Sequence, residues 1–176
     1  MNIFALHDDP KLAARDLCVE HMKMLVECAQ QLQTCFSLEL LAQAPRTALG
    51  TVRKHGNYNQ PCCKWARKSQ GNMQWLIDHA YEIEQVRLRN GCQPHYTVQF
   101  IDWVVHNLEK STVPIGPKTE HIVCINENKL CRQDVRFAAA SVVEKYRLFY
   151  VYDKPFATWF NAPPVWYTEL KQSISK

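Results

Sequence analysis

The residues most able to do chemistry form a short cluster near the N-terminus. Glu20, Lys23 and Glu27 recur at spacings of three and four, so a helical segment would place them on one stripe, with His21 beside it. A carboxylate next to an ammonium group suits acid–base or Schiff-base chemistry when such a stripe faces a cleft. The alternative is that Lys23 and Glu27, spaced i and i+4, form a surface ion pair.

A second group of candidates lies between Asn57 and His79. Trp65 and Trp75 recur there at helical spacing, and Asn72 and His79 interrupt an otherwise apolar face. Polar groups on such a face either satisfy one another inside the core or line a cleft. We expect Asn72 and His79 to form a second wall facing the stripe that carries His21 and Glu27.

Basic charge gathers in the same region. The chain has no acidic residue between Glu39 and Asp78, and aromatic side chains are interleaved with the cations there. Phosphate contacts next to stacking platforms are typical of nucleic-acid binding, whereas the alternative is a solvated basic face with the tryptophans in the core. The expected DNA-binding residues on this face are Arg46, Arg53, Lys54, His55, Lys64, Arg67 and Lys68. Further candidates towards the C-terminus are Tyr146, Arg147, Trp159 and Trp166.

The composition is that of an ordinary soluble globular protein. The 176 residues are 47% hydrophobic and 22% charged, and the net charge is only +4. There is no long apolar stretch and no basic leader, so we expect neither a membrane partner nor a secretory signal, and a cytoplasmic location. The eight cysteines include no C-x-x-C pair, so we expect reduced thiols and no bound metal. No glycine-rich phosphate loop is present, and we expect no cofactor.

The hydrophobic pattern predicts an all-α protein, a single domain of four to five helices. The expected elements are a short extended arm over residues 2–7, helices over 10–42, 61–89, 94–107 and 131–152, and an aromatic C-terminal tail. Proline and glycine exclude a helix over 111–119, and residues 120–125 are expected to be irregular or one short strand.

Three segments carry a resemblance to known proteins. They are AARDLCVEHMKMLVECAQ at 13–30, NYNQPCCKWARKS at 57–69 and FATWFNAPPVW at 156–166. Together with the short arm, they resemble small proteins common in tailed bacteriophages. More distantly, they resemble the pyrimidine dimer DNA glycosylase family, whose type is the phage endonuclease V. Residues 91–128 lie outside this resemblance.

The resemblance implies an all-α fold with the N-terminus beside the first long helix. In that family the terminal α-amine, exposed by methionine removal, attacks the sugar C1′ to give an imine. Carried over, the amine would be that of Asn2, Lys23 would match the basic helix position, and His21 and Glu27 would be the acid–base candidates. The family's glutamate aligns with Met24, nearly one turn before Glu27. The aromatic segment from Trp159 to Trp166 would contact the base.

The leading hypothesis is a DNA glycosylase or abasic-site lyase that acts on a damaged or modified pyrimidine in double-stranded DNA. If the chain is phage-encoded, it would act in the cytoplasm of the host cell. One alternative is a DNA-modification transferase or nucleotide-processing enzyme on the same helical scaffold. Another is a protein without enzymatic activity that binds DNA or a host protein.

Overall fold

The computed structural model of the chain describes residues 2–174, and within this range every regular element is a helix. This confirms the predicted all-α fold. As expected, residues 111–119 contain no helix, and residues 120–125 are irregular. The α-helices are α1 (Pro10–Arg15), α2 (Met24–Gln33), α3 (Leu38–Leu41), α4 (Pro61–Ala66), α5 (Gln70–Arg89), α6 (Val98–His106), α7 (Val142–Asp153) and α8 (Val165–Ile174). Three short 3-10 helices span Val19–His21, Leu108–Lys110 and Leu130–Gln133.

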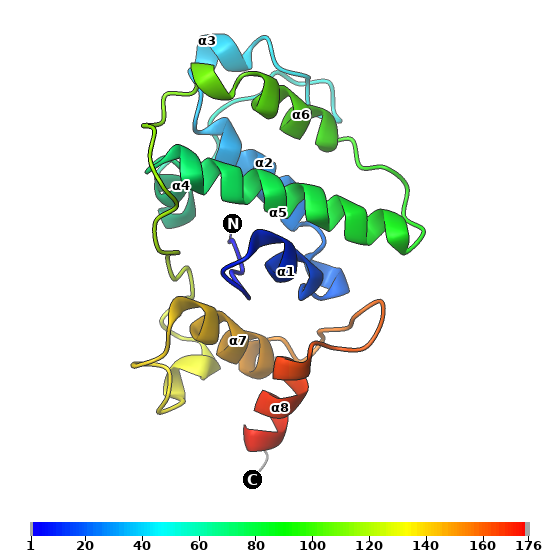
Figure 1. Cartoon of the computed structure of the whole chain (residues 1–176), viewed down its shortest axis with the longest axis vertical. Helices are drawn as coiled ribbons and strands as arrows, with labels where there is room; N and C mark the ends of the chain where they lie inside the picture. Colours follow the sequence, from blue (N-terminus) through cyan, green and yellow to red (C-terminus); the bar gives the residue numbers. More distant parts are fainter. Residues whose placement is uncertain (1, 175–176) are drawn as a thin grey trace.

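Helix α5 is the central element (Figure 1). Its 20 residues give a rod about 30 Å long at about 1.5 Å per residue. Helices α1, α2, α4 and α6 all contact it, whereas α7 packs against α8 at the other end of the molecule. The N-terminal arm lies between α5 and α7 (Figure 1). No helix in the described range is long and apolar enough to cross a membrane.

The expected single helix over residues 10–42 is wrong: this range holds three α-helices, and the C-terminal tail interrupts it between α1 and α2. Helix α1 is followed by its C-cap residue Asp16, whose carbonyl accepts a hydrogen bond from Trp159 Nε1 at 3.1 Å and whose carboxylate accepts one from Trp166 Nε1 at 2.7 Å. The backbone N–H of Val19 donates to the carbonyl of Thr158 at 2.8 Å. Backbone groups that a continuous helix would pair internally are therefore bonded to the tail.

The expected helix over residues 61–89 is likewise two helices, α4 and α5. Ser69 adopts an extended conformation and caps α5 by accepting from Asn72 N at 3.2 Å. The loop before Lys118 completes the cap, because Gln70 N donates to Pro114 O and Gly71 N donates to Gly116 O. The predicted end of this helix at Asn90 and Gly91 is confirmed: Gly91 has a φ of 79°, and Cys92 N donates to Arg87 O.

Three further boundaries differ from the expectation. Helix α6 begins at Val98 rather than at Pro94. Helix α7 begins only after Ser141, because Ser141 and Glu144 form a capping box. The aromatic tail contains an unexpected helix, α8, which begins just after Pro164.

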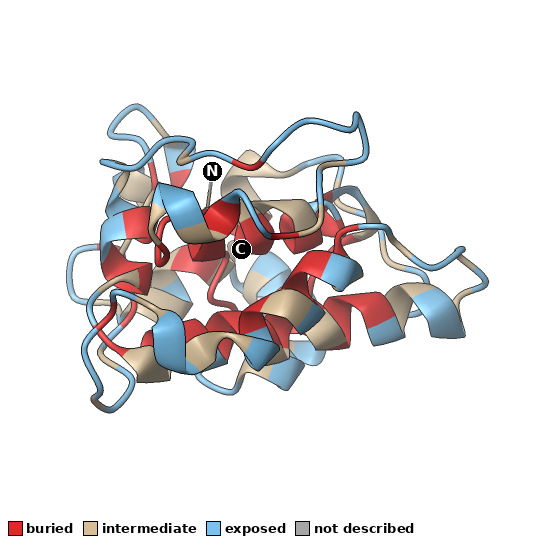
Figure 2. Ribbon diagram, turned by 90° about the horizontal axis from the view of Figure 1, so that it is seen from above, coloured by how far each residue is buried: buried red, intermediate tan, exposed pale blue. Residues whose placement is uncertain are grey.

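Buried residues gather on the inward faces of the helices, and exposed residues occupy the loops and the outer faces (Figure 2). The arm belongs to this core, since Ile3, Phe4, Ala5 and Leu6 are all at most 5% exposed. Burial of these four side chains anchors Asn2 against the middle of the chain, so the arm is a fixed part of the fold.

The close approach of α5 to the loop before Lys118 predicts a strong effect of one small substitution. A Cβ on Gly71 would lie 2.2 Å from Lys118 N and 2.5 Å from Pro117 C, both backbone atoms. We expect Gly71→Ala to lower the free energy of unfolding by about 2–3 kcal/mol in urea denaturation, as overpacking does. Gly56→Ala is the matched control, because a Cβ there meets no atom within 4 Å. Equal stability of the two variants would contradict this account.

Candidate active site at the N-terminal arm

The backbone nitrogen of Asn2 is held by a carboxylate. It donates to Glu27 Oε2 at 2.6 Å, a short and strong contact for an N–H donor. One turn further along α2, Gln31 Nε2 donates to Asn2 O at 2.8 Å. The Asn2 side chain donates to Cys124 O at 3.0 Å. Helix α2 and the irregular segment 120–125 therefore hold Asn2 from two sides.

The conformation of the arm explains how Asn2 reaches this position. Asn2 Oδ1 accepts from Ile3 N at 2.7 Å and from Phe4 N at 3.2 Å, which closes a tight local turn. Phe4 has a φ of 46°, a left-handed conformation that costs a non-glycine residue about 1 kcal/mol or more. Burial of the Phe4 ring offsets this cost, so the turn is imposed by tertiary packing.

The thiols of Cys62 and Cys124 lie beside each other at the segment that holds Asn2. The Cys62 thiol donates a hydrogen bond to the sulfur of Cys124, and this bond lowers the pKa of Cys124. The same bond, together with burial, raises the pKa of Cys62. The Tyr146 hydroxyl accepts from Cys124 N at 2.9 Å and donates to Ile122 O at 3.0 Å. Tyr146, expected at a DNA surface, is instead fully buried and fixes the segment that holds Asn2.

Of the expected catalytic residues, Asn2 and Glu27 are brought into direct contact, and Lys23 lies nearby. Lys23 is exposed immediately before α2, one turn ahead of Glu27. Both Asn2 and Glu27 are only partly buried. The carboxylate at the arm comes from Glu27 and not from the Met24 position of the alignment, because Met24 is buried in the core.

His21 lies in the core next to this site. Its ring is 3% exposed, stacks on Phe4 with a centroid distance of 4.3 Å, and shares a 2.5 Å hydrogen bond with the Tyr150 hydroxyl. Burial, and then the charges of Lys154 and Lys23, lower the pKa of His21 to about 4. A neutral, enclosed imidazole of this kind supports the arm and does not reach a solvent-exposed substrate.

The expected second wall of a cleft, Asn72 and His79, is also part of the core. Asn72 Nδ2 donates to Trp65 O at 2.7 Å, and Asn72 Oδ1 accepts from Thr119 N at 2.8 Å. His79 Nδ1 donates to Pro10 O at 2.9 Å, and burial lowers its pKa to about 4. Both side chains are 0% exposed, so neither faces a cleft. Asn72 joins α5 to α4 and to the loop at Thr119, and His79 joins α5 to α1.

The basic face is smaller than the sequence suggested. Arg53 is 6% exposed, donates through Nε to Pro45 O at 2.7 Å, and lies over the Phe100 ring at 4.1 Å. His55 donates to Phe36 O at 2.7 Å and is partly buried. Arg67 stacks on Tyr58 at 3.6 Å and donates to its carbonyl. Of the seven residues expected on this face, those that the structure leaves exposed are Arg46, Lys54, Lys64 and Lys68.

This placement predicts that replacing Arg53 destabilises the protein much more than replacing its neighbour Lys54. We expect Arg53→Ala to lower the free energy of unfolding by about 2–4 kcal/mol, because it removes a buried cation together with its hydrogen bond and ring contact. The exposed Lys54→Ala should leave stability within about 0.5 kcal/mol. Urea denaturation measures both. Weakened DNA binding by Arg53→Ala with unchanged stability would show that Arg53 acts at the surface after all.

The tail tryptophans have a structural role, because the indole N–H groups of Trp159 and Trp166 donate hydrogen bonds to Asp16. Arg147 donates to Leu6 O at 3.0 Å and lies over the Trp166 ring at 5.2 Å. The exposed tail aromatics are instead Phe156, which is 50% exposed, and Phe160, which is 37% exposed.

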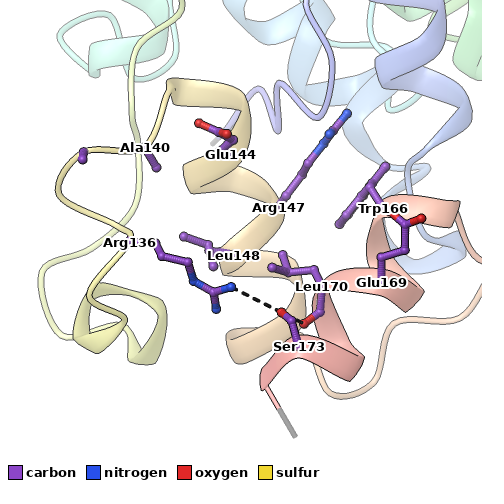
Figure 3. A pocket seen from close by; sticks show the side chains of 10 residues that line it. Arg136, Ala140, Glu144, Arg147, Leu148, Trp166, Glu169, Leu170 and Ser173 are labelled. Atoms are coloured by element: carbon purple, nitrogen blue, oxygen red, sulfur yellow. Dashed lines mark hydrogen bonds between the residues drawn. The ribbon is translucent and has the colours of Figure 1, made fainter. Parts of the chain in front are cut away.

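A groove lies between α7 and α8 (Figure 3), and Arg147, one of the residues that line it, also donates to Leu6 O of the arm. It has a volume of about 630 Å³, with Leu148 and Leu170 on its apolar floor and Arg136, Glu144 and Glu169 among its polar lining. Arg136 donates to Ser173 Oγ across its lower end. Because charges of both signs line this groove, its lining is not that of an anion-binding surface.

Fold and site together define an all-α protein whose N-terminal arm is buried and whose Asn2 nitrogen is held by a helix carboxylate. Comparisons with protein-family models, with curated proteins and with solved structures found no match.

The sequence did not single out two residues that hold Asn2, Gln31 and Cys124. Gln31 had a usable signal, because it follows Glu27 by four residues on one helix face. Cys124 had none, because it lies in an irregular segment far along the chain.

Proposed function

We propose that the protein is a DNA glycosylase or abasic-site lyase acting on a damaged or modified pyrimidine, with the nitrogen of Asn2 as its nucleophile. The observation that carries this proposal is the 2.6 Å contact between Asn2 N and Glu27 Oε2. In a chain that begins at Asn2, this nitrogen is an α-amine. Residue 1, and with it the question of methionine removal, lies outside the described residues.

The chemistry follows from the two groups. An α-amine has an ordinary pKa of about 8, so a useful fraction is neutral and nucleophilic near neutral pH. Its nitrogen forms a bond to C1′ of the deoxyribose while the bond from C1′ to the base, or to the hydroxyl of an abasic sugar, breaks. The Glu27 carboxylate accepts a proton from the nitrogen and passes it to the leaving base or hydroxide. The C1′–O4′ bond of the sugar ring then breaks while the remaining proton of the nitrogen is transferred to O4′, which gives an open-chain imine. Loss of a C2′ proton from this imine eliminates the 3′ phosphate.

Fixed geometry supports this assignment. The side chain and carbonyl of Asn2 are both hydrogen bonded, so its nitrogen is oriented before any substrate arrives. Such preorganisation supplies a large part of the rate in reactions that join two groups. A base taken out of the duplex needs a face on which to stack, and the exposed ring of Phe156 is the candidate near the arm.

Borohydride trapping on abasic-site DNA tests the proposal. Two forms of the chain are prepared by cleavage from a fusion, one beginning at Asn2 and one at Met1, and both are verified by mass spectrometry. We expect a covalent adduct with the form that begins at Asn2 and at least tenfold less with the other. No adduct from either form would refute the lyase. Equal amounts of adduct from both forms would show that Asn2 is not the nucleophile, and Lys23 would be the next candidate.

A further inference from the structure

A fixed stack of cationic and aromatic side chains lies at the end of α4. Arg67, the C-cap residue of this helix, lies over the Tyr58 ring at 3.6 Å and donates through Nη1 to Tyr58 O at 2.9 Å. The same ring stacks with that of His55 at a centroid distance of 5.0 Å, and His55 is itself hydrogen bonded to Phe36 O at 2.7 Å. The loop before α4 and the end of α4 are therefore held together at the surface, where Tyr58 is 43% exposed.

Two exposed lysines flank Arg67. Lys64 precedes it by three residues and Lys68 follows it directly. The helical turn continues through Lys68, whose N–H donates to Trp65 O at 3.0 Å. Residues three or four apart on such a turn have Cβ atoms about 5–6 Å from each other. Lys64, Arg67 and Lys68 therefore carry three positive charges on one turn, which we call the α4 surface.

The α4 surface has an excess of positive charge. In the described part of the chain, neither lysine ammonium group has a hydrogen-bond or ion-pair partner. The sequence contains no acidic residue between Glu39 and Asp78. A contact brings one other acidic residue close to α4, because Glu120 O accepts from Trp65 Nε1 at 2.8 Å, but Lys118, two residues earlier, is also exposed. The cations thus outnumber the carboxylates here, and a polyanion would stabilise them.

Helix α4 also supports the segment that holds Asn2. Trp65 lies between the two lysines in sequence, is 1% exposed, and fixes this segment through its bond to Glu120 O. Four residues further on, Cys124 O accepts from Asn2 Nδ2 at 3.0 Å. The buried face of α4 therefore contacts the segment that positions Asn2, while its exposed face carries the cations.

We propose that Lys64, Arg67 and Lys68 bind successive phosphates on one strand of the duplex that carries the substrate nucleotide. Successive nucleotides of one strand rise by about 3.4 Å along the duplex, so cations on a single helical turn are close enough together to reach neighbouring phosphates. Arg67 uses only Nη1 for Tyr58 O and keeps further N–H donors for a phosphate. Such contacts set the position of a protein on DNA. The choice of DNA rests on the proposed function, whereas the cationic surface does not.

The test measures binding without turnover. The full chain is titrated by fluorescence anisotropy, at several salt concentrations, with a duplex containing a tetrahydrofuran abasic analogue, which cannot form an imine. The variant combines Lys64→Gln with Lys68→Gln, and urea denaturation checks that it is folded. We expect its dissociation constant to rise about tenfold. The log–log salt slope should become shallower by roughly 1.8, which is about 0.9 for each of two phosphates no longer neutralised.

Lys145→Gln combined with Lys171→Gln is the matched control, because it removes the same charge from α7 and α8, at the other end of the molecule. Unchanged DNA affinity and salt slope in the folded Lys64 and Lys68 variant, or an equal loss in the control, would overturn the proposal. Competition with poly-glutamate identifies the partner. If poly-glutamate at the same concentration of charge displaces the duplex fully, the surface binds polyanions in general and the assignment to DNA is wrong.

Failure of this inference and failure of the proposed function give different results. If the wild-type chain gives no borohydride adduct but the Lys64 and Lys68 variant still loses DNA affinity, the lyase is refuted and the α4 surface stands. If the wild-type chain traps and the variant binds the abasic duplex as tightly as wild type, the lyase stands and the α4 surface is refuted.

Discussion

Replacing Glu27 with Gln is expected to slow single-turnover imine formation on abasic-site DNA by about 10²- to 10⁴-fold, the usual contribution of a positioned general base. The amide oxygen of Gln can still accept the hydrogen bond from Asn2 N, so the arm should keep its position. The variant loses only the ability to take the proton from the attacking nitrogen. The measurement is the rate of adduct formation under borohydride with enzyme in excess over DNA.

Glu20→Gln is the matched control for this prediction. Glu20 was an equal candidate on the sequence, but its carboxylate accepts from the hydroxyl and N–H of Thr158 and belongs to the contact with the tail. We expect Glu20→Gln to trap within about threefold of the wild-type rate. A wild-type rate in Glu27→Gln, or a larger loss in Glu20→Gln, would reassign the general base.

The second large effect expected is loss of stability in mild acid. Burial lowers the pKa of His21 and of His79 to about 4 and that of His121 to about 3. The ordinary pKa of an unfolded histidine is about 6.5, so below that pH the unfolded chain binds protons that the folded chain excludes. The free energy of unfolding should therefore be highest above pH 6.5. It should fall steadily between pH 6.5 and pH 4, by at most about 3 kcal/mol per histidine.

His121 allows this prediction to be isolated. Its ring stacks on Trp65 at 4.7 Å and meets Trp75 edge-on, and neither ring nitrogen has a hydrogen-bond partner within the described part of the chain. Phe has a similar shape and does not titrate, so His121→Phe should keep or increase stability at pH 7 and flatten the decline between pH 6.5 and 4. The exposed His106→Phe is the control and should keep the wild-type slope.

Urea denaturation at half-unit pH intervals measures both variants. An unchanged slope in His121→Phe would mean that another group carries the acid sensitivity. A variant that unfolds more easily at pH 7 would mean that the His121 ring has a polar role that its surroundings do not indicate.

Helix α2 shows how much of the site the sequence predicts. Spacing placed Lys23 and Glu27 on one helical face, and the resemblance named Lys23, His21 and Glu27 as partners of Asn2. Of these three, the structure bonds only Glu27 to Asn2. The choice between Glu20 and Glu27 was open, because helical spacing treats both alike. Only the position of the arm against α2 separates them, and that position depends on burial of Ile3 to Leu6 between helices distant in the chain.

The basic face shows the opposite case. Composition correctly located a cationic stretch between Glu39 and Asp78, but it gave no information on which cations are enclosed. Arg53 and the neighbouring Lys54 are indistinguishable by charge, yet one packs on Phe100 and the other is exposed. Likewise, Asn72 and His79 had the pattern of cleft residues and prove to be hydrogen-bonding members of the core.

The sequence by itself determined the helical class, the end of α5 at Asn90 and Gly91, and the segments that cannot be helical. Those features depend on periodicity and on local backbone preference, which act over a few neighbouring residues. Only the tertiary structure decided where the long helices break and which carboxylate meets Asn2. Each of these depends on a contact between distant segments, such as Trp166 with Asp16 or Cys124 with Asn2, and local sequence does not encode such a contact.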